Sequence, residues 1–507
     1  MSTKLNFLLA FILFFAPAHA VIRLPALISD NMILQQNSTV KLWGWANSGE
    51  RVSVAASWIK KPLMTTANPD GTWEVSIVTT KAGGPYTITF SGSNTIEVKN
   101  VLLGEVWLAS GQSNMEFFLG RKGSTGYTGA IDYENEIRNA NYPFIRTIDI
   151  PNRVSDDPQN DFRGEWKMCS PQTADTFSAV AFYFAKSVNA ATGYPVGIIN
   201  ATWGGTPAES WTRKEVLEND TSLVHIMERY KKQCEDYPAA YEKFKAELDK
   251  WKADTSKTKP AAPREPMGPK HSNSPYKLYN GMIAPVLPYT IKGAIWYQGE
   301  GNAGRAAQYH RLFPAMINNW REDFHNPKMP FYFVQIAPHK GQNPEIREAQ
   351  FYTLRHVPYT GMAVITDQGD SLDIHPRFKK PVGERLAFWA LKNEYGKKNI
   401  VVSGPLYSSM KVEGNKIRIN FDYADGLTAK DGDLKEFTIA DESGNFVPAT
   451  AKIEGKTILV WSDAIAKPVA VRFAYKNVPE PNLFNGAGLP ASPFRTDNYP
   501  LTTAGRY

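Results

Sequence analysis

The stretch EVWLASGQSNM, residues 105–115, decides the fold class of this chain. Its first half is a short apolar run, typical of a strand that is buried on both faces. Its second half predicts a tight turn, in which the small residue Gly111 permits a sharp backbone and Ser113 opens a helix. A serine on such a turn projects above the edge of a sheet, where it can act as a nucleophile. The turn also fits an ordinary serine N-cap, so this stretch alone leaves both interpretations open.

Four further apolar stretches predict strands of the same sheet. They are residues 196–201, 292–297, 331–336 and 362–366, and a helical pattern covers residues 306–323. Short buried strands joined by helices indicate a parallel sheet with helices on both faces. Ligands of such sheets bind at the carboxyl ends of the strands, the edge where Ser113 is expected. The predicted fold class is therefore α/β, and we expect this domain to span residues 101–396.

The segments on either side of this domain have a different pattern. Alternating apolar and polar residues, separated by Gly- and Pro-rich turns, predict an N-terminal β-sandwich domain over residues 21–100 and a C-terminal β domain over residues 397–507. Residues 218–270 are charged, helical in pattern and Pro-containing towards their end, which indicates an insertion into the central domain. This insertion is either a wall of the substrate site or a solvated decoration.

Composition narrows the class of protein. The chain has 507 residues, 42% of them hydrophobic, which is enough for more than one packed core. The net charge of +7 is spread along the chain without a basic stripe, so we expect no nucleic-acid partner. The 13 Trp and 23 Tyr residues suit sugar rings, although aromatic residues more often belong to the core.

The N-terminus and the two cysteines bear on the compartment. Residues 1–20 combine Lys4, an apolar run and Ala18-His19-Ala20, the pattern of a signal peptide. We therefore expect an exported protein, periplasmic or secreted, without a membrane anchor. In an oxidising compartment Cys169 and Cys234 could form a disulfide, and otherwise they are buried thiols.

A serine nucleophile needs a base, and His375 is the best candidate among the histidines. It follows the strand predicted to end near residue 366, on the same sheet edge as Ser113. Three carboxylates precede it within eight residues, Asp367, Asp370 and Asp373. An aspartate bonded to Nδ1 would fix the imidazole tautomer and stabilise the imidazolium. A calcium site is the alternative interpretation, but the loop lacks the EF-hand pattern.

Two more glycine-containing loops follow predicted strands. They are WGGTP at residues 203–207 and YQGEGN at residues 297–302. Backbone and side-chain amides in such loops can stabilise an oxyanion, although tight turns need the same glycines. Glu300 could serve as a general acid, but no second carboxylate lies near it in the sequence, which disfavours a glycosidase.

Together these motifs resemble the sialate O-acetylesterase family of the SGNH hydrolase superfamily. The resemblance rests on LISDNMILQ (27–35), GQSNM (111–115), WGGTP (203–207), WYQGE (296–300), DIHP (373–376), PNL (481–483) and GLPASPFRT (488–496). It implies an SGNH-type three-layer α/β/α domain and a Ser-His-Asp hydrolase that cleaves acetyl esters of carbohydrates, with no metal or organic cofactor.

The resemblance also implies roles for single residues. Ser113 would be the nucleophile and His375 the base, and the amides of Ser113 and Gly205 with the Gln298 side chain would hold the oxyanion. Asn302, Glu300 and Trp203 are candidate substrate-binding residues.

The sequence departs from the superfamily pattern in two places. The superfamily places its aspartate three residues before the histidine, where this chain has Leu372, so we choose Asp373 and keep Asp370 in reserve. The superfamily has an Asn in its third block, a role that Gln298 or Asn302 could fill, and we favour Gln298. The substrate alternatives are acetylated xylan or another glycan, and a non-catalytic sugar-binding protein is the alternative of a different class.

Overall fold

The longest strand, β7 (Thr95–Gly111), ties the N-terminal half of the chain together. The computed structural model describes residues 21–121, 126–256 and 258–507, so the predicted signal peptide lies outside the described residues. Up to residue 100 the side chains of β7 are mostly exposed or half-buried, and from Val101 to Gly111 every one is buried. The strand therefore leaves a sheet that faces solvent and enters one that is covered on both faces. The predicted boundary between residues 100 and 101 lies at this change, inside a continuous strand.

The second half of β7 lies in the middle of a parallel sheet. The strand order is β13-β12-β11-β7-β10-β8-β9, with β9 antiparallel, and four of the six N-terminal strands extend this sheet through β7 to 11 strands. The predicted α/β class is confirmed, as a large mixed sheet with additional β-sheet regions. Sequence reasoning missed β8 and β9. The strand bounds are β8 (Tyr142–Asp149), β9 (Lys167–Cys169), β10 (Val196–Thr202), β11 (Gly293–Tyr297), β12 (Phe331–Gln335) and β13 (Thr360–Val364).

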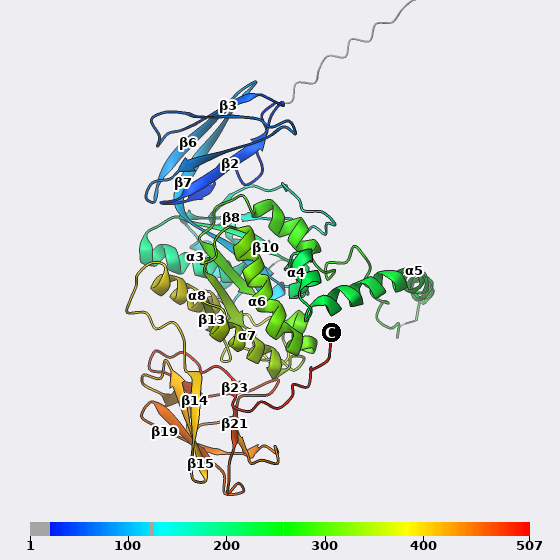
Figure 1. Ribbon diagram of the computed structural model, residues 1–507, viewed down its shortest axis with the longest axis vertical. Helices are drawn as coiled ribbons and strands as arrows, with labels where there is room; N and C mark the ends of the chain where they lie inside the picture. The colour runs from blue at the N-terminus through cyan, green and yellow to red at the C-terminus, as the bar shows by residue number, and fades with distance from the viewer. Residues whose placement is uncertain (1–20, 122–125, 257) are drawn as a thin grey trace, which may run out of the picture.

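Two pairs of helices cover this sheet, and Figure 1 shows them on its opposite sides. Helix α3 packs against α8, and α6 packs against α7. Among the described residues, no helix is both long and apolar enough to cross a membrane. The helices are α1 (Ser113–Glu116), α2 (Tyr133–Arg138), α3 (Ala179–Thr192), α4 (Lys214–Asn219), α5 (Val224–Ala253), α6 (Ala306–Asp323), α7 (Pro344–His356) and α8 (Lys379–Asn393), with short helical turns at Ala174–Thr176, Ala208–Trp211, Tyr279–Ile283, Ala284–Val286 and Glu300–Arg305.

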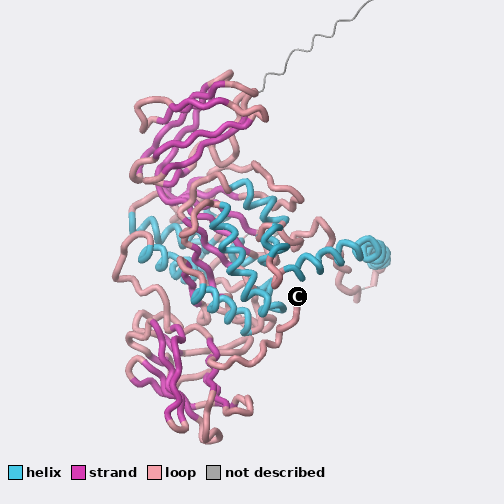
Figure 2. The backbone as a smooth tube through the Cα atoms, in the orientation of Figure 1, coloured by secondary structure: helices cyan, strands magenta, loops and turns pink. Residues whose placement is uncertain are grey.

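Helix α5 projects away from the rest of the molecule as an arm (Figures 1 and 2). It lies within the predicted insertion, and Ile226 is its only buried residue. The chain returns along the helix, where the Gln233 side chain donates to the Met267 carbonyl and the Trp251 indole to the Pro260 carbonyl. The first turn of the arm joins the main core through Ile226, and its outer part is held by these local contacts.

Both cysteines carry free thiols in the structure. Cys169 is buried in β9, and burial raises the pKa of its thiol to about 12. Cys234 is half-buried on α5. Of the two alternatives left open by the sequence, the structure therefore has thiols rather than a disulfide.

The remaining strands form the two ends of the molecule seen in Figure 2. The N-terminal strands share one hydrophobic core with the parallel sheet, whereas the C-terminal strands enclose a second core, which includes Ile419, Val460 and Phe473. The N-terminal strands are β1 (Ile33–Gln35), β2 (Thr39–Trp45), β3 (Arg51–Ala56), β4 (Leu63–Thr66), β5 (Thr72–Val78) and β6 (Gly83–Ser91). The C-terminal strands are β14 (Leu406–Glu413), β15 (Lys416–Asp422), β16 (Thr428–Ala429), β17 (Phe437–Ala440), β18 (Val447–Pro448), β19 (Thr450–Glu454), β20 (Thr457–Trp461), β21 (Ala470–Phe473), β22 (Leu483–Phe484) and β23 (Phe494–Arg495).

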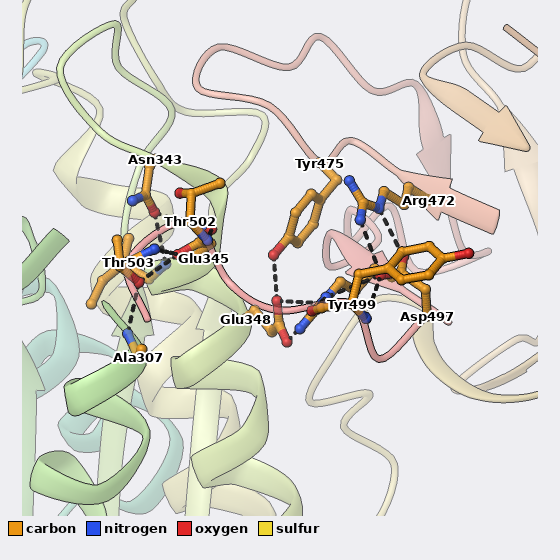
Figure 3. Close-up of polar contacts among 12 residues, drawn as sticks. Ala307, Asn343, Glu345, Glu348, Arg472, Tyr475, Asp497, Tyr499, Thr502 and Thr503 are labelled. Atoms are coloured by element: carbon orange, nitrogen blue, oxygen red, sulfur yellow. Dashed lines mark hydrogen bonds and ion pairs between the residues drawn. The ribbon is translucent and has the colours of Figure 1, made fainter. Parts of the chain in front are cut away.

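Polar contacts with α7 attach the C-terminal segment to the central sheet (Figure 3). Glu345, in the first turn of α7, accepts hydrogen bonds from the backbone amides of Thr502 and Thr503 and from the Thr503 hydroxyl. One turn later, Glu348 accepts from the Arg495 guanidinium and the Tyr475 hydroxyl. Because Glu345 is only 3% exposed, these bonds replace water that the carboxylate has lost.

We expect Glu345→Ala to lower the free energy of unfolding by about 2–4 kcal/mol, because buried donors left without an acceptor cost about 1–3 kcal/mol each. Urea unfolding monitored by circular dichroism measures the change. Glu345→Gln, which retains one carbonyl acceptor, is the matched control and should lose less. Equal stability of Glu345→Ala and the unmodified chain would show that these contacts do not hold the C-terminal segment.

Candidate active site

Ser113 follows a sharp turn at the end of β7. Only glycine fits at position 111 of this turn. Gly111 has a φ of 138°, and a Cβ at this position would lie 2.2 Å from the carbonyl oxygen of Tyr297. The next residue, Gln112, donates its backbone N–H to the same carbonyl at 3.0 Å. Strands β7 and β11 are thus drawn together at their carboxyl ends, and α1 begins directly afterwards with Ser113.

The structure brings His375 to Ser113. The His375 Nε2 atom lies 2.8 Å from the Ser113 Oγ, which is hydrogen-bond distance. Asp373 Oδ1 lies 3.9 Å from the His375 Nδ1, within ion-pair range but beyond a hydrogen bond. The same Asp373 oxygen accepts the backbone N–H of His375 at 2.8 Å. The serine and histidine are therefore paired directly, and the aspartate lies beside them.

The three carboxylates of the His375 loop have three different surroundings. Asp367 forms a two-pronged ion pair with Arg385 of α8, with N–O distances of 2.6 and 2.7 Å. Asp370 accepts the backbone amides of Leu372 and Asp373, and these bonds lower the pKa of its carboxyl group. Of the three, only Asp373 forms an ion pair with His375. The geometry therefore favours Asp373 over Asp370 as the partner of the imidazole.

The surroundings of His375 favour its neutral form. Burial lowers the pKa of the imidazole, and the Lys379 ammonium lowers it further. Asp373 acts in the opposite direction, and His339 adds a small lowering effect. The ring of Tyr127 packs edge-on against the imidazole at 5.6 Å between centroids. A neutral imidazole can accept the proton of the Ser113 hydroxyl, as a general base must.

The WGGTP loop lies directly beside Ser113. A Cβ on Gly204 would lie 3.3 Å from the Ser113 Cβ, and the Gly204 amide donates to Glu116 of α1 at 2.8 Å. Gly205 is exposed, with a φ of 76°. The half-buried Trp203 packs against the core and donates its backbone N–H to the Gly111 carbonyl. Gly204 therefore lies against the nucleophile, and the exposed Gly205 is the next residue in the loop.

Gln298 and Asn302 are buried and bonded to each other instead of opening into the site. The Gln298 Nε2 group donates to Asn302 Oδ1 at 2.7 Å and to the Thr206 carbonyl at 3.2 Å, which engages both of its hydrogens. Asn302 donates to Glu209 and accepts from the Ala208 amide. Gln298 therefore has no side-chain hydrogen left for an oxyanion, contrary to the role predicted for it. Both side chains bond to the backbone of the WGGTP loop or of the residue that follows it, and so hold this loop in place.

Glu300, predicted as a substrate-binding candidate, lies beneath the nucleophile turn. Its Oε1 atom accepts from the Asn114 side chain at 2.7 Å. Asn114 in turn accepts from Lys379 at 2.5 Å, and Lys379 is 1% exposed. Sequence reasoning assigned no role to Asn114, although it stands in the quoted motif, and a lysine at the start of a helix gives no sign that it is buried.

The part of the chain that the structure describes contains no cluster of metal ligands. No group of three or more His, Cys, Asp or Glu side chains there could hold a metal ion.

Known proteins resemble this chain over most of its length. The structure matches a carbohydrate acetylesterase from Xanthomonas citri with a TM-score of 0.80 and 35% identity, covering 94% of this chain and 100% of that one. The chain belongs to a family of carbohydrate acetylesterases. Residues 269–392 match the family described as carbohydrate esterase, sialic acid-specific acetylesterase. The sialate O-acetylesterases of Rattus norvegicus and Homo sapiens are each 28% identical to this chain, over 90% of both chains for the rat protein, and over 93% of this chain and 92% of the human one.

Membership of this family confirms the resemblance inferred from the motifs, and with it that the chain is an ester hydrolase. The matched segment, residues 269–392, contains Gln298, Glu300, Asn302 and His375, whereas Ser113 and Gly205 precede it.

We expect Asp373→Asn to lower kcat by about 10²- to 10⁴-fold, because the amide neither stabilises the imidazolium nor fixes its tautomer. Hydrolysis of a small aryl acetate measures the loss. Asp370→Asn is the matched control, since its carboxylate only orders the loop backbone, and it should lose less. A larger loss in Asp370→Asn would reverse our choice of aspartate.

Proposed function

We propose that this chain is a carbohydrate O-acetylesterase in which Ser113 is the nucleophile, His375 the general base and acid, and Asp373 the partner of the imidazole. The observation that carries the proposal is the 2.8 Å contact between the Ser113 Oγ and the His375 Nε2 at the carboxyl end of a parallel sheet. Family membership supplies the ester as substrate, and the lowered pKa of His375 suits a base that works near neutral pH.

The reaction divides into two proton-balanced steps. His375 takes the proton of Ser113 while the Oγ attacks the acetyl carbonyl, and it then gives this proton to the departing sugar oxygen. The products of this step are an acetylated Ser113 and the free sugar hydroxyl. Water then attacks the acetyl group with His375 as base, and acetate leaves as Ser113 recovers its proton.

The oxyanion of each tetrahedral intermediate needs donors that already point at it. We assign this role to the backbone amides of Ser113 and Gly205. Gly205 is exposed, and the loop that carries it adjoins the Ser113 side chain. Gln298 fixes that loop through the Thr206 carbonyl, so its contribution is to position the donors. This replaces the direct donation expected from the sequence.

The substrate is an acetylated carbohydrate, and we propose an O-acetylated sialic acid, the substrate class in the names of the curated relatives. Two half-buried aromatic residues belong to loops at the site: the Tyr127 ring packs against His375, and Trp203 bonds through its backbone to the strand end before Ser113. Their faces suit the apolar side of a sugar ring. Other acetylated glycans, such as acetylated xylan, present similar rings and remain the alternative.

The wider organisation follows the same proposal. We infer an SGNH-type three-layer α/β/α catalytic domain over residues 101–396, with an insertion at 218–270, flanked by β domains over 21–100 and 397–507. The separate C-terminal core and the projecting α5 support these divisions. We further propose removal of residues 1–20 and export to the periplasm or the medium. Mass spectrometry of the protein recovered from its host measures the mature N-terminus.

We expect Ser113→Ala to abolish acetate release and leave the melting temperature unchanged. The measurement compares the unmodified chain and the variant on an aryl acetate, 9-O-acetylated sialic acid and acetylated xylan. Acetate release from the sialic acid by the unmodified chain, but not by Ser113→Ala, supports the whole proposal. Release from xylan alone keeps the mechanism and changes the sugar. No release from any ester would leave a sugar-binding protein as the better description.

The pH dependence of kcat/KM follows from the lowered pKa of His375. Only the neutral imidazole accepts a proton, so kcat/KM should rise with pH through that pKa and level off above it. Because burial and Lys379 lower the pKa, the midpoint should lie below the ordinary histidine value of about 6.5. Initial rates on an aryl acetate between pH 4.5 and 8 measure it, after incubation controls for stability. A midpoint above 6.5, or a flat profile, would contradict this assignment.

A further inference from the structure

Asn114 links the nucleophile turn to the histidine loop through a single buried amide. It is the residue after Ser113 and is 0% exposed. Its Nδ2 group donates to the Ile374 carbonyl at 3.0 Å, and Ile374 directly precedes His375. The two neighbours in sequence of the reacting pair are therefore bonded to each other, 260 residues apart along the chain.

A buried lysine holds the other end of this amide. Lys379, the first residue of α8, donates from Nζ to Asn114 Oδ1 at 2.5 Å. Its ammonium also lies over the ring of Phe117, 4.5 Å from the centroid, and near that of Tyr297 at 5.5 Å. Burying a cation is costly, and these contacts offset only part of the loss of water. Burial lowers the pKa of the lysine to about 7, against the raising effect of Glu300 and Asp373.

Glu300 completes the set with a compensating carboxylate. Its Oε1 atom accepts the second hydrogen of the Asn114 amide at 2.7 Å, and its Oε2 atom is buried with no hydrogen-bond partner among the described residues. Burial raises the pKa of this carboxyl group. Four separate segments thus converge on one amide: α1, the turn after β11, the histidine loop and α8. An apolar core would fill this space at lower cost, so the network calls for a functional reason.

We propose that Lys379, Asn114 and Glu300 form a positioning clamp that holds the Ser113 Oγ and His375 Nε2 at bonding distance. The inference rests on the proposed roles of Ser113 and His375. The amide fixes the spacing, because it bonds to the backbone on the histidine side and is continuous with the serine on the other. None of the three residues contacts the reacting atoms themselves, so each acts through Ser113 or His375.

The charge of Lys379 also gives a way to detect the clamp, because only a small set of charged and aromatic groups faces His375. The groups that face His375 are Asp373 from its own loop, Lys379 from α8, His339 from the loop after β12 and the Tyr127 ring. Lys379 is the cation with the largest effect on the imidazole among them. Removing it should therefore raise the pKa of His375, whereas a purely structural defect would leave that pKa unchanged.

The test compares Lys379→Met, Lys379→Arg and Lys380→Met on an aryl acetate as a function of pH. Lys379→Met should lower kcat and move the acid limb of kcat/KM to higher pH. Lys379→Arg keeps the charge and a donor, so its acid limb should stay at the position of the unmodified chain even where kcat falls. Lys380 is exposed on the same helix turn, and its variant is the matched control with unchanged kinetics.

Asn114→Leu tests the spacing independently. It should lower kcat by about 100-fold with KM nearly unchanged, the cost of misplacing reacting groups by about 1 Å. In the double variant with Asn114→Leu and Lys379→Met, the loss of kcat should be smaller than the two single losses combined, because both substitutions remove the same interaction. Melting curves identify variants that fail to fold, and Lys379→Arg then carries the test.

The outcomes separate this inference from the proposed function. Absence of esterase activity in the unmodified chain, or full activity in Ser113→Ala, would overturn the proposed function. An active chain that loses activity in Ser113→Ala, but whose Lys379→Met and Lys380→Met profiles coincide, would overturn the clamp alone.

Discussion

The close approach of two strand ends is the constraint on which the site depends. Gly111 at the end of β7 lies so near the Tyr297 carbonyl of β11 that no side chain fits between them. This contact ends the strand, accepts the Gln112 amide and sets the direction in which α1 departs. It also brings the loop after β11 against the loop after β7, since Gln112 Oε1 accepts the Gly301 amide at 3.1 Å. The nucleophile is thus positioned by backbone packing rather than by its own side-chain contacts.

Buried polar side chains then fix each loop around this turn. The WGGTP loop is held by Gln298 through Thr206 and by Glu116 through Gly204. The histidine loop is anchored at its start by Asp367 and Arg385, and near its end Arg377 donates to the Gly129 carbonyl. Polar groups buried in this way are expensive unless every partner is present. The arrangement therefore has few alternative conformations of similar energy, which suits a site that needs fixed distances.

Much of this was predictable from the sequence, for identifiable reasons. Strand β10 and helix α6 are predictable because their apolar patterns are regular, and Ser113 and His375 could be expected at one sheet edge because each follows the end of a predicted strand. Strand β8 was missed because charged Arg146 and two exposed residues interrupt its pattern. The position of Gln298 could not be predicted either, since side-chain amides serve equally as oxyanion donors or loop supports. Only the distances between segments remote in sequence distinguish these roles.

The two sides of the imidazole are held with different stiffness, and this difference has a physical origin. On the Nε2 side, the backbone before His375 is bonded to a fully buried amide, so the distance to Ser113 is set by the core. On the Nδ1 side, Asp373 has a half-exposed side chain whose Oδ1 atom bonds to the backbone of the same loop. A shift of this carboxylate by about 1 Å would give a hydrogen bond to Nδ1, without moving any buried group. A sugar that covers the loop would remove water from Asp373 and strengthen its attraction to the imidazolium. The Ser–His contact is therefore fixed by the fold, whereas the Asp–His contact can tighten without any rearrangement of the core.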